Sequence, residues 1–250
     1  MATLITSTRT GVTLTRPLAL MLLSAAIAPA APSLISHTAA GSITTFTTPA
    51  INTSGANFII ASIFYETAGG AVLSDSSSNT WSTAMSQGAG GQTQTTYYVL
   101  NPTTSSTHTF TITGSGTMYA SLEVAAFSGV LGADVSSNIC TPSNFPLSAG
   151  SILPTQNGDL IVSAIGFYTG GGWTGTLAVG NGYSLTDTVP MGSTFGGSLA
   201  YLVQDTTTAT NPVWTATDPM TQACATTIAF KSSALKSGPA IISRHKVVGQ

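Results

Sequence analysis

The sequence predicts an all-β protein, a two-sheet β-sandwich with a jelly-roll-like fold built from two diverged repeated halves. Three observations predict it: short apolar segments rich in β-branched and aromatic residues, turn residues between them, and a match between the first and second half of the chain. Beyond the N-terminal segment, no stretch of a dozen residues has the apolar periodicity of a helix.

The apolar segments have the length and composition of strands. Residues 58–64, 97–100 and 160–165 are clear examples, each bounded by Gly, Asn, Pro or Ser. Segments 122–127 and 226–230 alternate in a way that predicts one buried face for each strand.

An internal match indicates that the two halves are related. ANFIIASIFYET at 56–67 matches GDLIVSAIGFYT at 158–169, an offset of 102 residues (158 − 56). The same offset places Trp81 on Tyr183, so we expect these two aromatic side chains to occupy equivalent core positions.

The register of the later strands stays open. TYYVLNP matches AYLVQDT at an offset of 104 (200 − 96). Matching residues 125–127 to residues 228–230 gives an offset of 103 residues, whereas matching Phe110 to Trp214 gives an offset of 104. A slip of one residue turns every side chain of a strand to the opposite face, so the sequence does not fix these faces.

Residues 36–231 are expected to form one sandwich domain, with halves at about 44–130 and 150–231. A single half-sheet would expose an apolar face, and two halves can cover each other, which favours one sandwich over two in tandem. Residues 1–35 form an N-terminal apolar arm or signal-like segment, and residues 232–250 form a basic C-terminal tail.

The N-terminal segment has two open interpretations. Residues 17–30, PLALMLLSAAIAPA, follow Arg9 and Arg16 and end in small residues, as in a secretory signal peptide. The alternative is a retained apolar arm that packs on the body or on a neighbouring chain. The apolar run is shorter than the roughly 20 residues that cross a bilayer, so we expect no transmembrane span.

Charged residues are scarce and unevenly placed. They make up 6% of the chain, compared with about 25% in ordinary soluble proteins. All eight acidic residues lie between two groups of cations near the chain ends. We expect the ends to anchor the protein to an acidic partner, and the alternative is a compositional habit of the source organism. The candidate anchoring residues are Arg9, Arg16, Lys236, Arg244 and Lys246.

The sequence contains no motif for catalysis, cofactor binding or metal binding. It lacks paired zinc-ligand spacing, a phosphate loop, a dinucleotide fingerprint and the G-x-S-x-G elbow. Glu66 and Glu123 are expected to be solvated surface acids, and His37 and His108 polar surface residues, with His37 ahead of the domain. We therefore predict no catalytic residue, no cofactor and no metal, and a protein that is not an enzyme. Residues 32–230 contain no Lys or Arg to neutralise phosphates, so we expect no nucleic acid to bind the body.

Three local features are further candidates. The segment from Asp75 to Asn79 is expected to form a turn that leads Trp81 into the core. Trp173 lies in the glycine-rich segment GGGWTG and is a candidate ligand contact. Cys140 and Cys224 are a candidate disulfide in an oxidising compartment, and otherwise two free thiols. The sequence leaves both states open.

The segments SGANFIIASIFY, SDSSSNTW, HTFTITGSGTMYASLEVAAFSG and NGDLIVSAIGF are part of a pattern that covers residues 36–231. As a set they resemble a family of Ser/Thr/Gly-rich β-sandwich proteins encoded in tailed-bacteriophage genomes and found among some secreted bacterial proteins. The resemblance implies surface display or virion association and no particular activity. The apolar N-terminal segment and the basic C-terminal tail depart from the family pattern.

Two functional hypotheses follow. The first is a non-enzymatic structural protein of a phage virion, such as a head-decoration, fibre or tail-associated subunit. It would be a homo-oligomer displayed on the particle and anchored to other virion proteins through its terminal segments. The alternative is a secreted or cell-surface bacterial adhesin or carbohydrate-binding module that contacts a host-surface glycan.

Overall fold

A computed structural model describes residues 30–66, 70–142, 145–191 and 194–233, and these residues form sixteen strands and no helix. The prediction of an all-β sandwich is confirmed. The first eight strands are β1 (Ser33–Ser42), β2 (Phe46–Thr47), β3 (Phe58–Glu66), β4 (Ala71–Asp75), β5 (Ser82–Ala89), β6 (Gln92–Leu100), β7 (Phe110–Gly114) and β8 (Tyr119–Ser128). The others are β9 (Val130–Pro142), β10 (Leu147–Ser148), β11 (Asp159–Tyr168), β12 (Leu177–Val179), β13 (Ser184–Met191), β14 (Phe195–Gln204), β15 (Val213–Ala216) and β16 (Gln222–Ser232).

Each half of the chain forms a five-stranded sheet and a three-stranded sheet. The first half has the orders β1-β8-β3-β6-β5 and β2-β7-β4, and the second has β9-β16-β11-β14-β13 and β10-β15-β12. The second set is the first with every label raised by eight, so both halves have the same jelly-roll-like strand order. The origin of the halves from one duplicated sequence stays a prediction.

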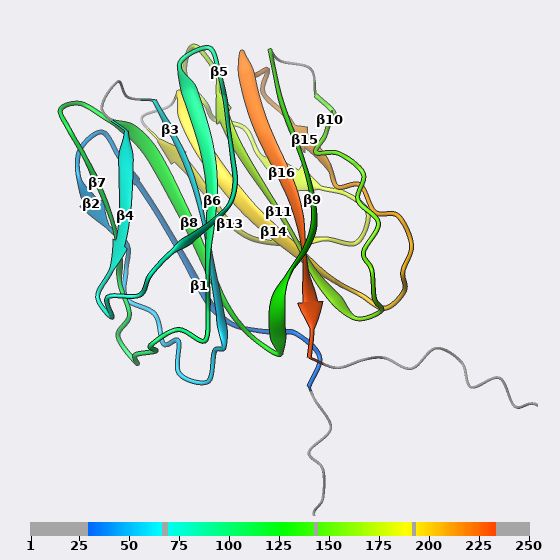
Figure 1. The fold of residues 1–250 in the computed structure, drawn as a ribbon. Helices are drawn as coiled ribbons and strands as arrows, with labels where there is room; N and C mark the ends of the chain where they lie inside the picture. The colour runs from blue at the N-terminus through cyan, green and yellow to red at the C-terminus, as the bar shows by residue number, and fades with distance from the viewer. Residues whose placement is uncertain (1–29, 67–69, 143–144, 192–193, 234–250) are drawn as a thin grey trace, which may run out of the picture.

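The four sheets lie in four layers, with the two five-stranded sheets in the centre and a three-stranded sheet on each outer side (Figure 1). One apolar core lies inside each half, and a third lies between the halves where the two larger sheets face each other. The halves therefore cover each other, as expected. However, each half is also a sandwich by itself, so the expected pair of sheets describes only the centre of the molecule.

The central strands are buried on both faces. Along β8, Ala125 belongs to the core between the halves and Ala126 to the core of the first half, and both side chains are 0% exposed. The expectation of one buried face for 122–127 and 226–230 is wrong, because an outer sheet covers the second face of each larger sheet. Continuous apolar runs are typical of strands in this position.

Strand pairing settles the register of the last strands. Phe58 pairs with Phe127, and Leu160 pairs with Phe230. Phe58 and Leu160 are equivalent positions with an offset of 102 residues, so their partners Phe127 and Phe230 are also equivalent. The offset between the final strands of the two halves is therefore 103 residues (230 − 127). The same pairing logic gives 103 for β6 and β14, because Leu160 pairs with Val203 where Phe58 pairs with Leu100. The sequence match of TYYVLNP to AYLVQDT was therefore one residue out of register.

The match of Phe110 to Trp214 is also wrong. Phe46 of β2 pairs with Ile112 in the first half, and Leu147 of β10, the equivalent strand, pairs with Trp214 in the second half. Ile112 therefore occupies the position of Trp214. All three of these β7 and β15 side chains are fully buried. Aromatic similarity is a weaker guide to register than the hydrogen-bonded ladder.

Two expected boundaries differ from the strands. β1 begins at Ser33, within the segment assigned to the arm and before the expected start of the first half at 44. β9 crosses the segment 131–149, which was left between the two expected halves. Both are edge strands of the larger sheets, and edge strands carry the weakest apolar pattern because one side lacks a neighbouring strand.

Candidate functional site

The few carboxylates of the body are used inside the protein. Glu123 and Asp159 are 0% exposed, and the Asp75 side chain is also 0% exposed. The aspartates within hydrogen-bond distance of protein donors include Asp75, Asp134, Asp159, Asp187 and Asp218. The surface of the described residues is therefore less acidic than the charge count suggested.

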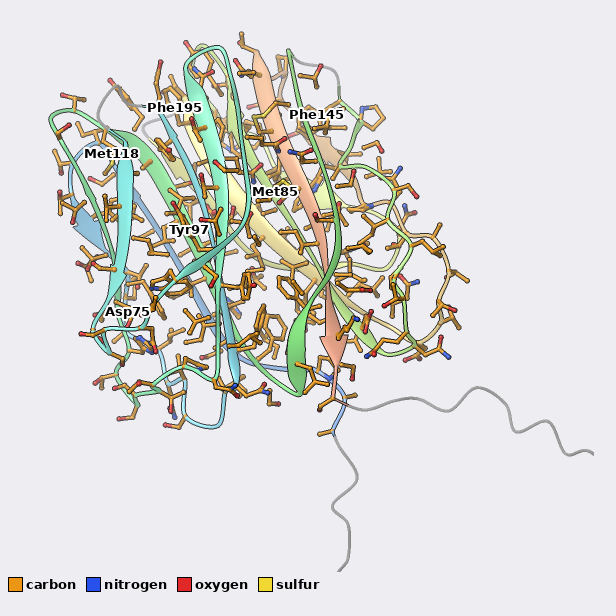
Figure 2. The ribbon with its side chains drawn as sticks, viewed as in Figure 1. Asp75, Met85, Tyr97, Met118, Phe145 and Phe195 are labelled. Carbon is orange, nitrogen blue, oxygen red and sulfur yellow. A yellow bond between two sulfur atoms is a disulfide. The ribbon has the colours of Figure 1, made fainter. Side chains whose placement is uncertain are left out.

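Asp75 organises the turn after β4, at the lower end of the three-stranded sheet (Figure 2). Its Oδ1 accepts hydrogen bonds from the backbone N of Ser77 at 2.8 Å and from Nδ2 of Asn79 at 3.2 Å. Its Oδ2 accepts the indole Nε1 of Trp81 at 2.8 Å. The expected turn is present, and its aspartate holds the half-buried tryptophan in place.

His108 connects this turn to a neighbouring loop. Its Nε2 lies 3.0 Å from Oδ1 of Asp75, and its Nδ1 lies 3.0 Å from Oγ1 of Thr53. The ring also stacks on Phe110, with 4.5 Å between the centroids. The expectation of a surface His108 is wrong, because the side chain is 0% exposed. The reason is that β7 starts beneath the loop that contains Thr53.

The order hydroxyl, imidazole, carboxylate is the order of a hydrolase triad. However, Thr53 is also 0% exposed. Its Oγ1 donates to the backbone oxygen of Ser105 and accepts from the backbone N of the same residue. A nucleophile must reach the substrate, and this hydroxyl is covered. The arrangement therefore cross-links three segments of the first half and has no access to a substrate.

We expect Asp75→Asn to lower the free energy of unfolding by about 3 kcal/mol. The new amide would direct N–H groups at donors such as Nε1 of Trp81 in a fully buried position, which leaves hydrogen bonds unmade. Chemical unfolding followed by tryptophan fluorescence measures the loss. Asp205→Asn, at an exposed aspartate, is the control, and equal effects of the two substitutions would contradict the assigned role.

Glu123 is a second buried carboxyl that sequence reasoning placed on the surface. It lies on β8, and neither carboxylate oxygen has a hydrogen-bond partner. Burial raises the pKa of Glu123 to about 8, the nearby hydroxyl of Ser121 opposes the rise, and the charge of Asp187 adds to it. A neutral carboxyl at ordinary pH is therefore part of the contact between the halves.

His37 is an exposed residue, as expected, but it lies on a strand of the fold and not ahead of the domain. It belongs to β1, and its Nδ1 lies 2.6 Å from Oδ2 of Asp187 on β13. The two side chains are 38% and 28% exposed. This contact joins the first half to the second at one side of the larger sheets.

Asp159 is buried at the start of β11. Its Oδ1 accepts the backbone N of Ser232, and its Oδ2 has no partner. Burial raises the pKa of Asp159 to about 6, and the nearby Asp134 contributes to the rise. Glu66, the second glutamate, is half-buried at the end of β3.

Trp173 is a core residue more than a contact residue. It is 7% exposed and packs against Phe167, with ring centroids 4.7 Å apart. Its edge lines a shallow hollow of about 300 Å³ together with Leu177, Thr188 and Pro190. Gly170, with a φ of 69°, begins this loop, and Trp173 packs into the core of the second half.

Another hollow, of about 350 Å³, lies at the loops of the second half. Its polar lining includes Asn181, Asp205 and Asn211, with Leu202 at one side. Neither hollow brings a carboxylate and an imidazole together. No group of three or more His, Cys, Asp or Glu residues in the described ranges could hold a metal ion.

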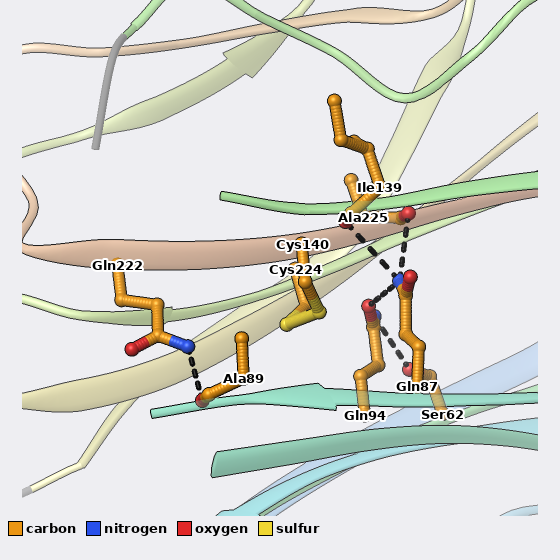
Figure 3. Close-up of a disulfide and its surroundings, with 9 residues drawn as sticks. All are labelled: Ser62, Gln87, Ala89, Gln94, Ile139, Cys140, Gln222, Cys224 and Ala225. Carbon is orange, nitrogen blue, oxygen red and sulfur yellow. Dashed lines mark hydrogen bonds between the residues drawn. A yellow bond between two sulfur atoms is a disulfide. The ribbon is translucent and has the colours of Figure 1, made fainter. Parts of the chain in front are cut away.

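Cys140 and Cys224 form a disulfide (Figure 3). The residues lie directly opposite each other on β9 and β16, with 4.1 Å between their Cα atoms. The amide of Gln87 donates to the backbone oxygens of Ile139 and Ala225, and Gln222 donates to the backbone oxygen of Ala89. These amides bridge the two halves on either side of the disulfide, a contact that sequence spacing could not show.

The two ends of the described chain meet. Oγ of Ser233 donates to the backbone oxygen of Ala30 at 2.8 Å, and the backbone N of Ser233 donates to Gly129. The described chain therefore begins and ends at the same place, at the lower end of the larger sheets (Figure 1). Lys231 lies two residues before Ser233, and its Nζ is 3.8 Å from Oδ1 of Asp134. The candidate anchoring residues lie outside the described residues, and they are Arg9, Arg16, Lys236, Arg244 and Lys246.

Comparison of the chain with protein-family models, with curated proteins and with solved structures finds no match. The resemblance to phage-encoded sandwich proteins therefore stays a prediction. In the part of the chain that the structure describes, no helix has the length and apolar character needed to cross a membrane.

Proposed function

We propose that this protein is a non-enzymatic structural subunit displayed on a phage virion and anchored through its two terminal segments. The contact between Ser233 and Ala30 carries the proposal, because one basic segment of the sequence precedes Ala30 and the other follows Ser233. Five of the six cations of the sequence lie in those segments, before Ala30 and after Ser233. We propose that the two basic segments attach together to an acidic surface while the sandwiches point away from it.

The placement of the carboxylates supports a structural role. Asp75 stabilises a turn, Asp187 joins the two halves, and the hydroxyl–imidazole–carboxylate series of Thr53, His108 and Asp75 is covered. Jelly-roll-like sandwiches occur in viral capsid proteins and in lectins. Because a fold does not determine a function, the fold alone supports both of the functional hypotheses equally.

The disulfide favours the second candidate function, a secreted or cell-surface adhesin or carbohydrate-binding module. Disulfides persist in oxidising compartments, and the segment at 17–30 has the composition of a secretory signal. Intact mass and N-terminal sequencing of the natural protein separate the two candidates. A start near Ala31 supports secretion, and a retained Met1 supports the virion subunit.

We expect the natural protein to copurify with phage particles and to be released as salt rises from 0.1 to 1 M. The electrostatic screening length falls from about 10 to about 3 Å over this range, which weakens charge-based attachment. Immunoblots of purified particles and of particle-free supernatant measure the distribution.

The decisive variant replaces Arg9, Arg16, Lys236, Arg244 and Lys246 by Gln. It should fold and remain in the supernatant. Lys231→Gln, which removes a cation from the body, is the matched control and should bind as the unaltered protein does. Normal attachment of the five-residue variant would overturn the anchoring role.

A further inference from the structure

The junction between the two larger sheets has apolar ends and a polar middle. Along β8, Ala125 and Phe127 belong to the apolar core between the halves, and Tyr119 packs on a second apolar cluster with Phe64 and Phe195. Ser121 and Glu123 lie between these two regions on the same face of the strand. A carboxyl group is therefore enclosed where two sandwiches meet.

Glu123 reaches directly onto the opposite half. A Cβ atom on Gly197 of β14 would overlap the carboxylate of Glu123 and the hydroxyl of Ser121, so both side chains lie over the bare backbone of that glycine. Glu123 is 0% exposed, and neither of its oxygens has a hydrogen-bond partner. Only the absence of a side chain at position 197 allows this contact.

No Lys or Arg in the part of the chain that the structure describes pairs with this carboxyl. Its neighbours in the ladder are Ser62 on β3 and Ala39 on β1, both uncharged. The charged group that acts on this carboxyl is Asp187 of β13, whose partner is His37 of β1. The other titratable groups on β8 and on the strands packed against it are Tyr65 and Glu66 of β3, Tyr119 of β8 and Tyr201 of β14. Lys231, the one Lys or Arg among the described residues, lies beside Asp134. Ionisation would place a second negative charge near Asp187 in a fully buried site.

We propose that the junction between the halves is a proton-operated latch, which is closed while Glu123 carries a proton and opens when Glu123 loses it. Separation of the two larger sheets admits water to the carboxylate. It leaves each half intact, because each half has its own apolar core. Opening at the junction is therefore a less costly response to ionisation than unfolding of a whole half.

The direction of the pH effect follows from linkage. Burial raises the pKa of Glu123 from 4.5 to about 8 in the closed form, and a solvated glutamate in the open form has an ordinary pKa. The open form therefore binds fewer protons across this interval. The opening equilibrium should rise up to about tenfold per pH unit towards pH 8 and level off above it.

Two adjacent alanines provide matched reporters. Ala125 faces the junction and Ala126 faces the core of the first half, and both are 0% exposed. In the full oxidised chain, the alkylation rates of Ala125→Cys and Ala126→Cys are measured from pH 6 to pH 9. Their ratio cancels the intrinsic pH dependence of the thiol. We expect the ratio of junction rate to core rate to rise about fiftyfold between pH 6 and pH 8, because the closed form is itself half ionised at pH 8.

Glu123→Gln in each reporter should make the ratio independent of pH, because the amide is neutral at every pH tested. Glu66→Gln, at the only other glutamate of the sequence, should keep the full rise. Parallel acceleration of both reporters would show global unfolding and overturn the latch, and so would a rise that persists in Glu123→Gln.

A measurement without added cysteines keeps the proposal testable if a reporter fails to fold. Binding of a fluorescent apolar dye to the unaltered protein should increase from pH 6 to pH 8 while far-UV circular dichroism stays constant. Glu123→Gln should bind the same low amount of dye throughout. Constant dye binding by the unaltered protein would overturn the latch. These tests do not depend on the proposed function.

Discussion

Gly166→Ala is expected to lower the free energy of unfolding by about 3 kcal/mol, near the upper end of the cost of overpacking a core. A Cβ atom at position 166 would overlap the ring of Phe64, which inserts from the first half onto the bare backbone of β11. The two positions occupy equivalent places in the matched segments of the two halves (166 − 64 = 102). A large residue in one half therefore fills the space left by the smallest residue in the other.

Chemical unfolding of a double-mutant cycle measures this effect. Phe64→Ala removes the ring that the new methyl group would meet, so Gly166→Ala should cost far less in that background. Gly171→Ala is the control, since a Cβ atom at position 171 meets nothing within 4 Å. Equal costs of Gly166→Ala with and without Phe64 would show that the two side-chain positions are not in contact.

Replacing both cysteines by alanine is expected to lower the free energy of unfolding by about 4 kcal/mol. The disulfide joins residues 84 apart in the sequence, and a loop of that length restricts the unfolded chain strongly in the chain-entropy model. The loss should appear as a lower urea midpoint for Cys140→Ala/Cys224→Ala than for the unaltered protein. β9, an edge strand, should become the first strand to exchange its amide hydrogens.

A reducing agent provides the internal control for this prediction. It should destabilise the unaltered protein by a similar amount and leave the double variant unchanged. Two freely titrating thiols in the unreduced, unaltered protein would contradict the disulfide itself.

The sequence predicted several particular elements well. The apolar runs at 58–64 and 160–165 became β3 and β11, the central strands of the two larger sheets. The turn that follows Asp75 was also expected, because Asp, Ser and Asn favour hydrogen bonds to their own backbone. These are local preferences, which short segments carry by themselves.

The candidate site residues were harder to place. Glu123 and His108 are polar, and polarity alone suggests an exposed position. Glu123 is buried because Gly197, which is distant in the sequence, leaves room for it. His108 is buried because Asp75 and Thr53 supply partners for both ring nitrogens. The unbroken apolar character around Glu123 was the signal that could have indicated its burial.

By itself the sequence determined that this chain is all-β, that the apolar faces of its two halves cover each other, and that its cations lie near its ends. Only the tertiary structure decided that there are four layers, that carboxylates are enclosed, and that both ends meet at Ala30 and Ser233. The physical reason is that strand preference and charge are properties of short segments. Layering, burial of polar groups and proximity of the ends depend on pairings between residues that are far apart in the chain.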